Sequence, residues 1–154
     1  MKHRMTDETL LWRVRTFIYG HFAATTHAPD LNTIAQHFNL SAEQGTEILN
    51  ALHEIHALFL DPGTTNIRIA NPFSVVPTPF AVEVNGQRYW ANCAWDSFGV
   101  VAALQATEGV IHANCAHSDT PLQLYVHQGE VINTTAIIHI LVPFREWYQN
   151  MVYT

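Results

Sequence analysis

A thiol and a carboxylate lie three residues apart in the segment RYWANCAWDSFGV, residues 88–100. The thiol is Cys93 and the carboxylate is Asp96, and their neighbours are mainly aromatic or small apolar residues. We expect a helix to begin here with Asn92 as its N-cap, which places Cys93 in the first turn. Because residues three apart share a face of a helix, the two side chains should meet.

The start of a helix should lower the pKa of the Cys93 thiol, because unpaired backbone amides there favour a thiolate. The charge of Asp96 opposes a thiolate, so we expect the pair to share one proton, in a dry environment that Trp90, Trp95 and Phe98 could supply. Such a pair suits attack on a soft electrophile followed by protonation of the leaving group. The structural alternative is a small buried core cysteine beside an aspartate that caps the helix.

Composition limits the classes of protein to consider. The chain has 154 residues, of which 48% are apolar and 13% are charged, enough to bury a core in one domain or two small ones. Its net charge of −6 disfavours a nucleic-acid surface, which is normally basic. The sequence has no signal-peptide pattern and no long apolar span, so we expect a cytoplasmic protein that binds neither nucleic acid nor membrane. Its two cysteines, Cys93 and Cys115, are then expected to be free thiols.

Residues 1–70 follow the order of a winged helix-turn-helix, which is three helices and then a hairpin. Apolar residues at helical spacing predict helices within residues 7–23, 30–40 and 40–60, the third with a Ser41 cap, and the turn DPGTTN follows. Such a lobe suggests either DNA binding or a packing module. The third helix would enter the major groove, but its exposed positions carry no lysine or arginine, which opposes phosphate contacts. These positions are Glu43, Gln44, Glu47, Asn50 and Glu54.

A proline-rich linker, residues 71–80, leads to a second lobe at residues 81–154, which we expect to be α+β with a mixed sheet. Asn85-Gly86 predicts a hairpin turn, and the helix that carries Cys93 and Asp96 follows it. Further strands are predicted at 109–116, 121–128 and 134–143, the last buried on both faces because it is almost continuously apolar. PFREWYQN would add one or two helical turns, and MVYT resembles the start of another strand.

Two histidine patterns resemble metal sites, but their spacing disfavours metal binding. On a strand, Cys115 and His117 face one way and His112 the other, which does not gather three ligands. His53 and His56 can share a helix face, but a third ligand is not evident, so a solvated face is the better interpretation.

The sequence from residue 72 to residue 150 resembles the organomercurial (alkylmercury) lyase family. The motifs that carry the resemblance occur in the family's order: PTPF at 77–80, a tyrosine-bearing hairpin, the CAxD helix start at 93–96 and the CA…TP run at 115–121. The family's N-terminal lobe is winged-helix-like and is not thought to read DNA, which agrees with the acidic third helix.

The resemblance implies an enzyme that cleaves carbon–mercury bonds by protonolysis, giving a hydrocarbon and thiol-bound Hg(II). Cys93 matches the first catalytic cysteine, which binds mercury, and Asp96 matches the catalytic aspartate, which moves the proton to the departing carbon and lies at the metal. Cys115 matches a further cysteine that is structural in the family and a weaker candidate metal ligand. No cofactor is required, and Hg(II) is the bound product. The implied partners are an organomercurial substrate and either small thiols or a mercury-accepting reductase.

The chain departs from the family at the second catalytic cysteine, whose thiolate would make the carbon basic enough to take a proton. That cysteine is expected about where the chain ends at Thr154, and no cysteine follows Cys115. We interpret the chain as truncated at its C-terminus relative to the family. It is then a fragment of a full lyase, a short protein that binds mercury without cleaving it, or a lyase in which Cys115 supplies the second thiol. A transcriptional regulator with a ligand-sensing second lobe is the remaining alternative.

Overall fold

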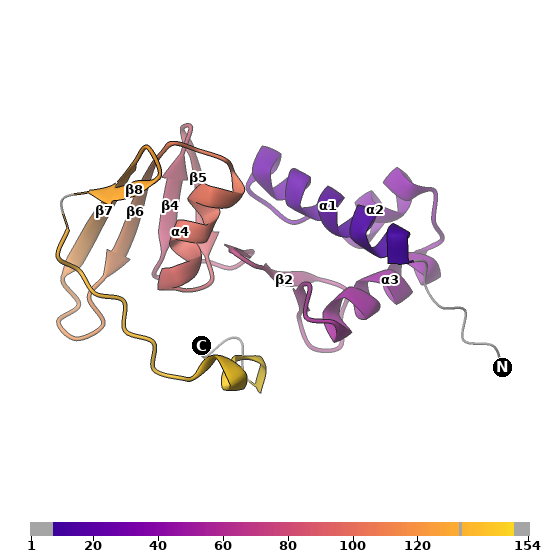
Figure 1. The fold of residues 1–154 in the computed structure, drawn as a ribbon. Coiled ribbons are helices and arrows are strands. Elements are labelled where there is room, and N and C mark those ends of the chain that lie inside the picture. Colours follow the sequence, from indigo (N-terminus) through magenta and orange to yellow (C-terminus); the bar gives the residue numbers. More distant parts are fainter. Residues whose placement is uncertain (1–7, 133, 150–154) are drawn as a thin grey trace. The chain divides into compact units, whose positions relative to one another are not determined.

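The computed structural model describes residues 8–132 and 134–149, and it divides into two compact units, Met1–Ala70 and Asn71–Thr154 (Figure 1). The strand predicted at 151–154 lies outside the described residues. Over the described ranges, no helix combines the length and the apolar character that a membrane span requires.

The first unit is a three-helix cluster followed by a short hairpin. Its elements are α1 (Glu8–Thr25), α2 (Leu31–Phe38), α3 (Ala42–Glu54), β1 (Phe59–Leu60) and β2 (Ile67–Ala70), with β1 and β2 antiparallel. The core is formed by buried apolar side chains from all three helices: Val14, Ile18, Phe22, Ile34, Ile48, Leu49 and Leu52. The predicted helices and the hairpin are therefore confirmed.

The third helix begins as its sequence predicts. Ser41 is the N-cap, its hydroxyl accepts a hydrogen bond from the Gln44 amide at 3.1 Å, and the Gln44 side chain accepts from the Ser41 amide at 2.9 Å. This reciprocal arrangement satisfies two amides that would otherwise lack partners. The predicted polar and acidic positions of α3 are all exposed: Glu43, Gln44, Glu47, Asn50 and Glu54.

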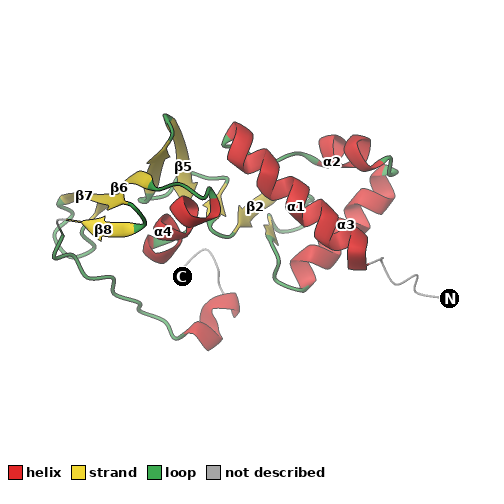
Figure 2. Ribbon diagram, turned by 45° about the horizontal axis from the view of Figure 1, so that its top comes forward, coloured by secondary structure: helices red, strands yellow, loops and turns green. Residues whose placement is uncertain are grey.

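The second unit contains an antiparallel sheet with one helix. The strands are β3 (Phe73–Ser74), β4 (Ala81–Val84), β5 (Gln87–Ala91), β6 (Glu108–Asn114), β7 (Pro121–His127) and β8 (Glu130–Ile132), and the helix is α4 (Ala94–Ala103). Along the sheet the strands follow the order β3-β5-β4-β6-β7-β8, and all neighbours are antiparallel. Figure 2 shows the strands of this unit in yellow and its helix α4 in red. Helices and antiparallel strands together confirm the predicted α+β class.

The hairpin between β4 and β5 forms at the predicted turn. Asn85 and Gly86 both have positive φ angles, 51° and 76°. A two-residue turn of this type matches the twist of the strands and is favoured by asparagine followed by glycine. The hairpin fixes the end of β5 at Ala91, two residues before Cys93, and so sets where α4 begins.

Helix α4 packs closely against the sheet. Val100 and Val101 of α4 are buried, as are Val82 of β4 and Ile111 of β6. Gly109 of β6 allows the close approach, because a Cβ built at this glycine would lie 2.8 Å from Cγ2 of Val101. This packing anchors the helix whose first turn carries the cysteine and the aspartate.

The prediction of a strand at residues 134–143 is wrong. The residues run as an extended, non-strand segment toward the short 3-10 helix η1 (Phe144–Gln149), which confirms the helical turns predicted there (Figure 1, yellow end of the colour scale). Side chains of the segment are largely exposed, with Ile137 at 90% and Leu141 at 75%. A continuous apolar run does not by itself distinguish a doubly buried strand from a segment whose side chains line a pocket. Here part of the run, Ile138–Val142, lines a cavity.

Candidate functional site

Cys93 itself is the N-cap of α4, one residue later than predicted. Its backbone is extended, with φ −147° and ψ 178°, and its sulfur accepts a hydrogen bond from the Asp96 amide at 3.4 Å. The sulfur thus takes the place that a serine or threonine oxygen usually has at a helix start. The prediction of Asn92 as the N-cap is wrong because the thiol fills that role.

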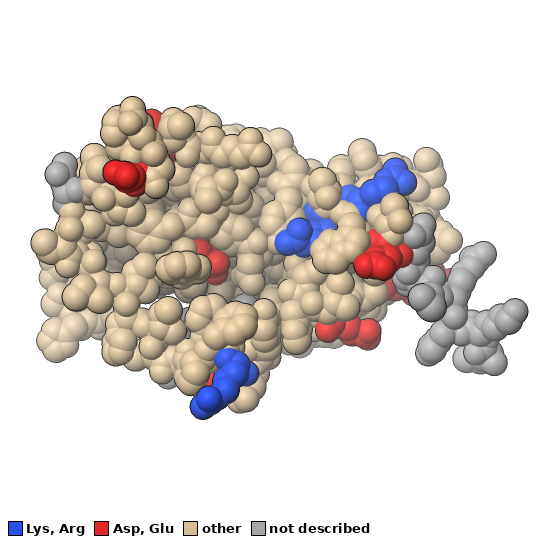
Figure 3. Space-filling model, in the orientation of Figure 1, with Lys and Arg blue, Asp and Glu red and all other residues tan. Residues whose placement is uncertain are grey.

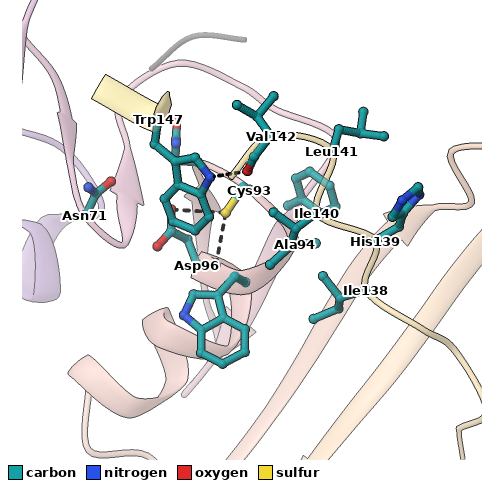
Figure 4. A pocket seen from close by; sticks show the side chains of 13 residues that line it. Asn71, Cys93, Ala94, Asp96, Ile138, His139, Ile140, Leu141, Val142 and Trp147 are labelled. Carbon is teal, nitrogen blue, oxygen red and sulfur yellow. Dashed lines mark hydrogen bonds between the residues drawn. The ribbon is translucent and has the colours of Figure 1, made fainter. Parts of the chain in front are cut away.

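The thiol and the carboxylate meet, as their spacing predicts. Cys93 Sγ donates a hydrogen bond to Asp96 Oδ2 at 3.4 Å while it accepts one from the Asp96 amide (Figure 4). The two residues therefore bind one another through both backbone and side chain. A proton on sulfur has a carboxylate oxygen within hydrogen-bonding distance as its acceptor.

The pKa of Cys93 is raised, not lowered as its position at the helix start predicts. Burial is the largest cause, and with the nearby Asp96 charge it raises the pKa of the thiol to about 11, although backbone amides of Trp95 and Asp96 act in the opposite direction. Burial also raises the pKa of Asp96, against hydrogen bonds from Cys93 and Asn92. Desolvation outweighs the amides because the pair lies among apolar side chains. At neutral pH the sulfur keeps its proton.

Both groups border an apolar cavity of about 170 Å³. Most of its wall comes from the start of α4, the extended segment Ile138–Val142 and Trp147 of η1, and Asn71 and Phe80 complete it. The lining residues are Asn71, Phe80, Asn92, Cys93, Ala94, Trp95, Asp96, Ile138, His139, Ile140, Leu141, Val142 and Trp147. Figure 4 shows Trp147 among the side chains that line the cavity, and its Nε1 donates a hydrogen bond to the Val142 carbonyl at 2.7 Å. This bond ties η1 to the extended segment at the cavity.

The apolar surroundings differ from those that the sequence suggested. Trp95 lines the cavity as expected, but Trp90 and Phe98 are not among its lining residues. Phe80, Trp147 and the Ile138–Val142 segment were missed. The run of apolar residues after Thr135 was the available signal, and its interpretation as a strand concealed its place at the site.

Cys115 lies apart from the residues that line this cavity, in the turn after β6. Its backbone is fixed by two hydrogen bonds, because its amide donates to Thr120 O at 2.9 Å and its carbonyl accepts from the Asp119 amide at 2.8 Å. Hydrogen bonding from Ser118 lowers the pKa of the Cys115 thiol. Cys93 and Cys115 are both free thiols, which confirms that prediction.

Across residues 8–132 and 134–149, histidine, cysteine, aspartate and glutamate side chains do not form a group of three that could hold a metal ion. His112 and His117, which the sequence disfavoured as ligands, therefore join no such group with Cys115. Charged side chains are sparse on the face drawn in Figure 3, in keeping with a chain in which 13% of residues are charged.

Comparison with known proteins identifies the family. No curated protein matches the chain. Among solved structures, the crystal structure of the mercury-bound form of MerB2 has a similar fold, with a TM-score of 0.61 and 18% sequence identity over 83% of this chain and 68% of that one. Residues 73–154, more than half of the chain, match the family MerB, alkylmercury lyase. The chain therefore belongs to the alkylmercury lyase family.

Proposed function

We propose that this protein cleaves carbon–mercury bonds of organomercurials by protonolysis, with Cys93 as the mercury ligand and Asp96 as the proton carrier. The observation that carries the proposal is the 3.4 Å hydrogen bond from Cys93 Sγ to Asp96 Oδ2 beside an apolar cavity. Membership of the alkylmercury lyase family supports the substrate class.

The geometry allows a first step in which one proton changes place. Mercury in R–Hg–X is a soft acid that prefers sulfur. As the S–Hg bond forms, X leaves with its bonding electrons, and the thiol proton passes from Sγ to the Asp96 carboxylate. The raised pKa of Asp96 favours its acceptance of the proton, because burial stabilises the neutral carboxyl. The raised pKa of the Cys93 thiol opposes loss of the proton, and formation of the S–Hg bond offsets that cost.

In the second step the Asp96 carboxyl returns that proton to the carbon bound to mercury. The C–Hg bond breaks as the C–H bond forms, and its electron pair becomes the C–H bond of the hydrocarbon R–H. Mercury remains as Hg(II) on the Cys93 sulfur, and the Asp96 carboxylate is ionised again. A second thiolate would increase the negative charge on carbon, and an added small thiol can supply it.

Hydrocarbon release tests this function directly. The protein is incubated with phenylmercury acetate and excess small thiol in D₂O, and benzene is measured in the headspace by mass spectrometry. We expect benzene that carries one deuterium, formed faster than in the thiol-only background. Cys93→Ser should reduce release to that background, whereas Cys115→Ser, the matched control, should retain it. Equal rates for wild type and Cys93→Ser contradict the proposal.

A second candidate is a protein that holds mercury without breaking the bond. The observation in its favour is that Cys93 is the one thiol among the described residues that line the cavity. This candidate predicts a stable adduct of intact phenylmercury on Cys93 and benzene release no faster than the thiol background. Mass spectrometry of the protein under non-denaturing conditions distinguishes the phenylmercury adduct from bound Hg(II).

A further inference from the structure

Two tryptophans from separate segments line the cavity beside the Cys93 sulfur. Trp95 comes from the first turn of α4, and Trp147 comes from η1. Trp95 is 63% exposed, which is unusual for so large an apolar side chain and leaves much of its indole surface free for contact. Trp147 is held by its hydrogen bond to the Val142 carbonyl, so its ring is fixed at the cavity wall.

The size of the cavity suits one small ring. Its volume is about 170 Å³. An engineered apolar cavity of about 150 Å³ in another protein binds benzene, so a space of this size accepts a six-membered ring. Aromatic rings gain additional energy from stacked or edge-on contact with tryptophan, beyond the area that they bury.

The lining disfavours a charged organic group. Among the described residues that line the cavity, Asp96 is the acidic side chain, and none is a lysine or arginine. A carboxylate on the organic group would lose its hydration and face Asp96, and His139 is the one lining side chain among the described residues that can become cationic.

We propose that Trp95 and Trp147 form the recognition surface for the organic group of the substrate and make the site prefer an uncharged group of phenyl size over a charged one. This inference rests on the proposed function, because it assigns the group that leaves mercury to this cavity. It concerns specificity at Cys93 and not the bond-breaking step.

Labelling of the two cysteines tests the preference without any turnover. The protein is treated with N-phenylmaleimide or N-(4-carboxyphenyl)maleimide, which differ by one carboxylate, and the rates at Cys93 and Cys115 are measured by peptide mass spectrometry. Cys115 is the internal reference, since it lies outside the residues that line the cavity. We expect the Cys93-to-Cys115 rate ratio to be at least about tenfold higher for the phenyl reagent.

Variants locate the source of the preference. The phenyl preference is the factor by which the Cys93-to-Cys115 rate ratio is higher for N-phenylmaleimide than for the carboxylated reagent. Trp95→Ala and Trp147→Ala should each reduce this preference several-fold. Trp147→Phe keeps an aromatic ring but loses the N–H donor, and it should retain most of the preference. Tyr148→Ala is the matched control, because Tyr148 lies in η1 and is exposed but does not line the cavity. Circular dichroism of each variant verifies folding.

Equal ratios for the two reagents in the wild type overturn the inference, as does a preference that both tryptophan-to-alanine variants retain. Either result leaves the proposed function intact, because benzene release from phenylmercury is measured separately. Conversely, a strong phenyl preference without benzene release supports the recognition surface and argues against catalysis.

Discussion

The reactivity of Cys93 is controlled by what surrounds the sulfur more than by its place at the helix start. Burial raises the pKa of the thiol to about 11, and the neighbouring carboxylate adds to the shift. A protonated thiol is a poor nucleophile toward ordinary alkylating reagents, but mercury displaces the proton because its affinity for sulfur is high. The site is therefore expected to discriminate in favour of soft metals.

The pH dependence of alkylation tests this view. The rate of Cys93 modification by iodoacetamide should continue to rise with pH up to about 11, because the thiolate forms only there. Cys115, whose pKa is lowered, should reach its plateau at lower pH. Asp96→Asn removes the negative charge that disfavours the thiolate, so the Cys93 midpoint should shift to lower pH. Rates for each cysteine come from peptide mass spectrometry, and a wild-type Cys93 midpoint below the ordinary value of 9.0 contradicts the account.

At the scale of the helix, Cys93 has two separable roles, as the N-cap of α4 and as the proposed ligand. The Asp96 amide donates to Sγ at 3.4 Å, which is a weak cap because sulfur is a poor acceptor. A serine at the same place offers a better acceptor for the same amide. Stability and mercury binding should consequently respond in different ways to substitution.

Cys93→Ser should leave the free energy of unfolding unchanged or increase it by up to about 1 kcal/mol, while Cys93→Ala should be about 1 kcal/mol less stable than Cys93→Ser. Both variants should lose mercury binding at this site. Urea unfolding and titration with phenylmercury measure the two properties. A Cys93→Ser protein that is clearly less stable than the wild type would show that the sulfur contributes packing that the cap does not explain.

The contact between α4 and β6 provides a second prediction at the scale of elements. Gly109→Ala places a Cβ 2.8 Å from Cγ2 of Val101, a stiff β-branched side chain on the buried face of α4. We expect a loss of about 1–3 kcal/mol, because the well-packed helix must shift. In α1, a Cβ at Gly20 meets no atom within 4 Å, so Gly20→Ala should be stabilising by about 0.5–1 kcal/mol. Thermal unfolding measures the stability of the two variants, Gly109→Ala and Gly20→Ala. Equal changes in stability would argue against tight packing at Gly109.

At the scale of the molecule, local signals predicted most elements. Ser41 marked the start of α3, Asn85-Gly86 marked the β4–β5 turn, and the spacing of Cys93 and Asp96 predicted their contact. Each of these features depends on a few neighbouring residues and on backbone preferences that the sequence expresses directly.

The errors concern features that depend on residues distant in sequence. The pKa of Cys93 is raised because the thiol is buried. The wall of the cavity that the thiol borders includes residues about fifty positions later in the chain, Ile138–Val142 and Trp147. The apolar run at 134–143 has the composition of a buried strand, and only the folded arrangement shows that part of it lines a cavity. The cavity, and with it the two-tryptophan surface, could not be read from local pattern.

The central claim is that Cys93 binds mercury and Asp96 moves the proton, and Asp96→Asn tests it most directly. Asparagine keeps the shape of the side chain but does not carry the proton. One turnover of phenylmercury with excess thiol is followed by native mass spectrometry for bound mercury and by headspace detection for benzene. The account predicts that Asp96→Asn holds phenylmercury on Cys93 as the wild type does, and that benzene release falls to the thiol background. Benzene release at the wild-type rate, or loss of mercury binding by a folded Asp96→Asn protein, would contradict it.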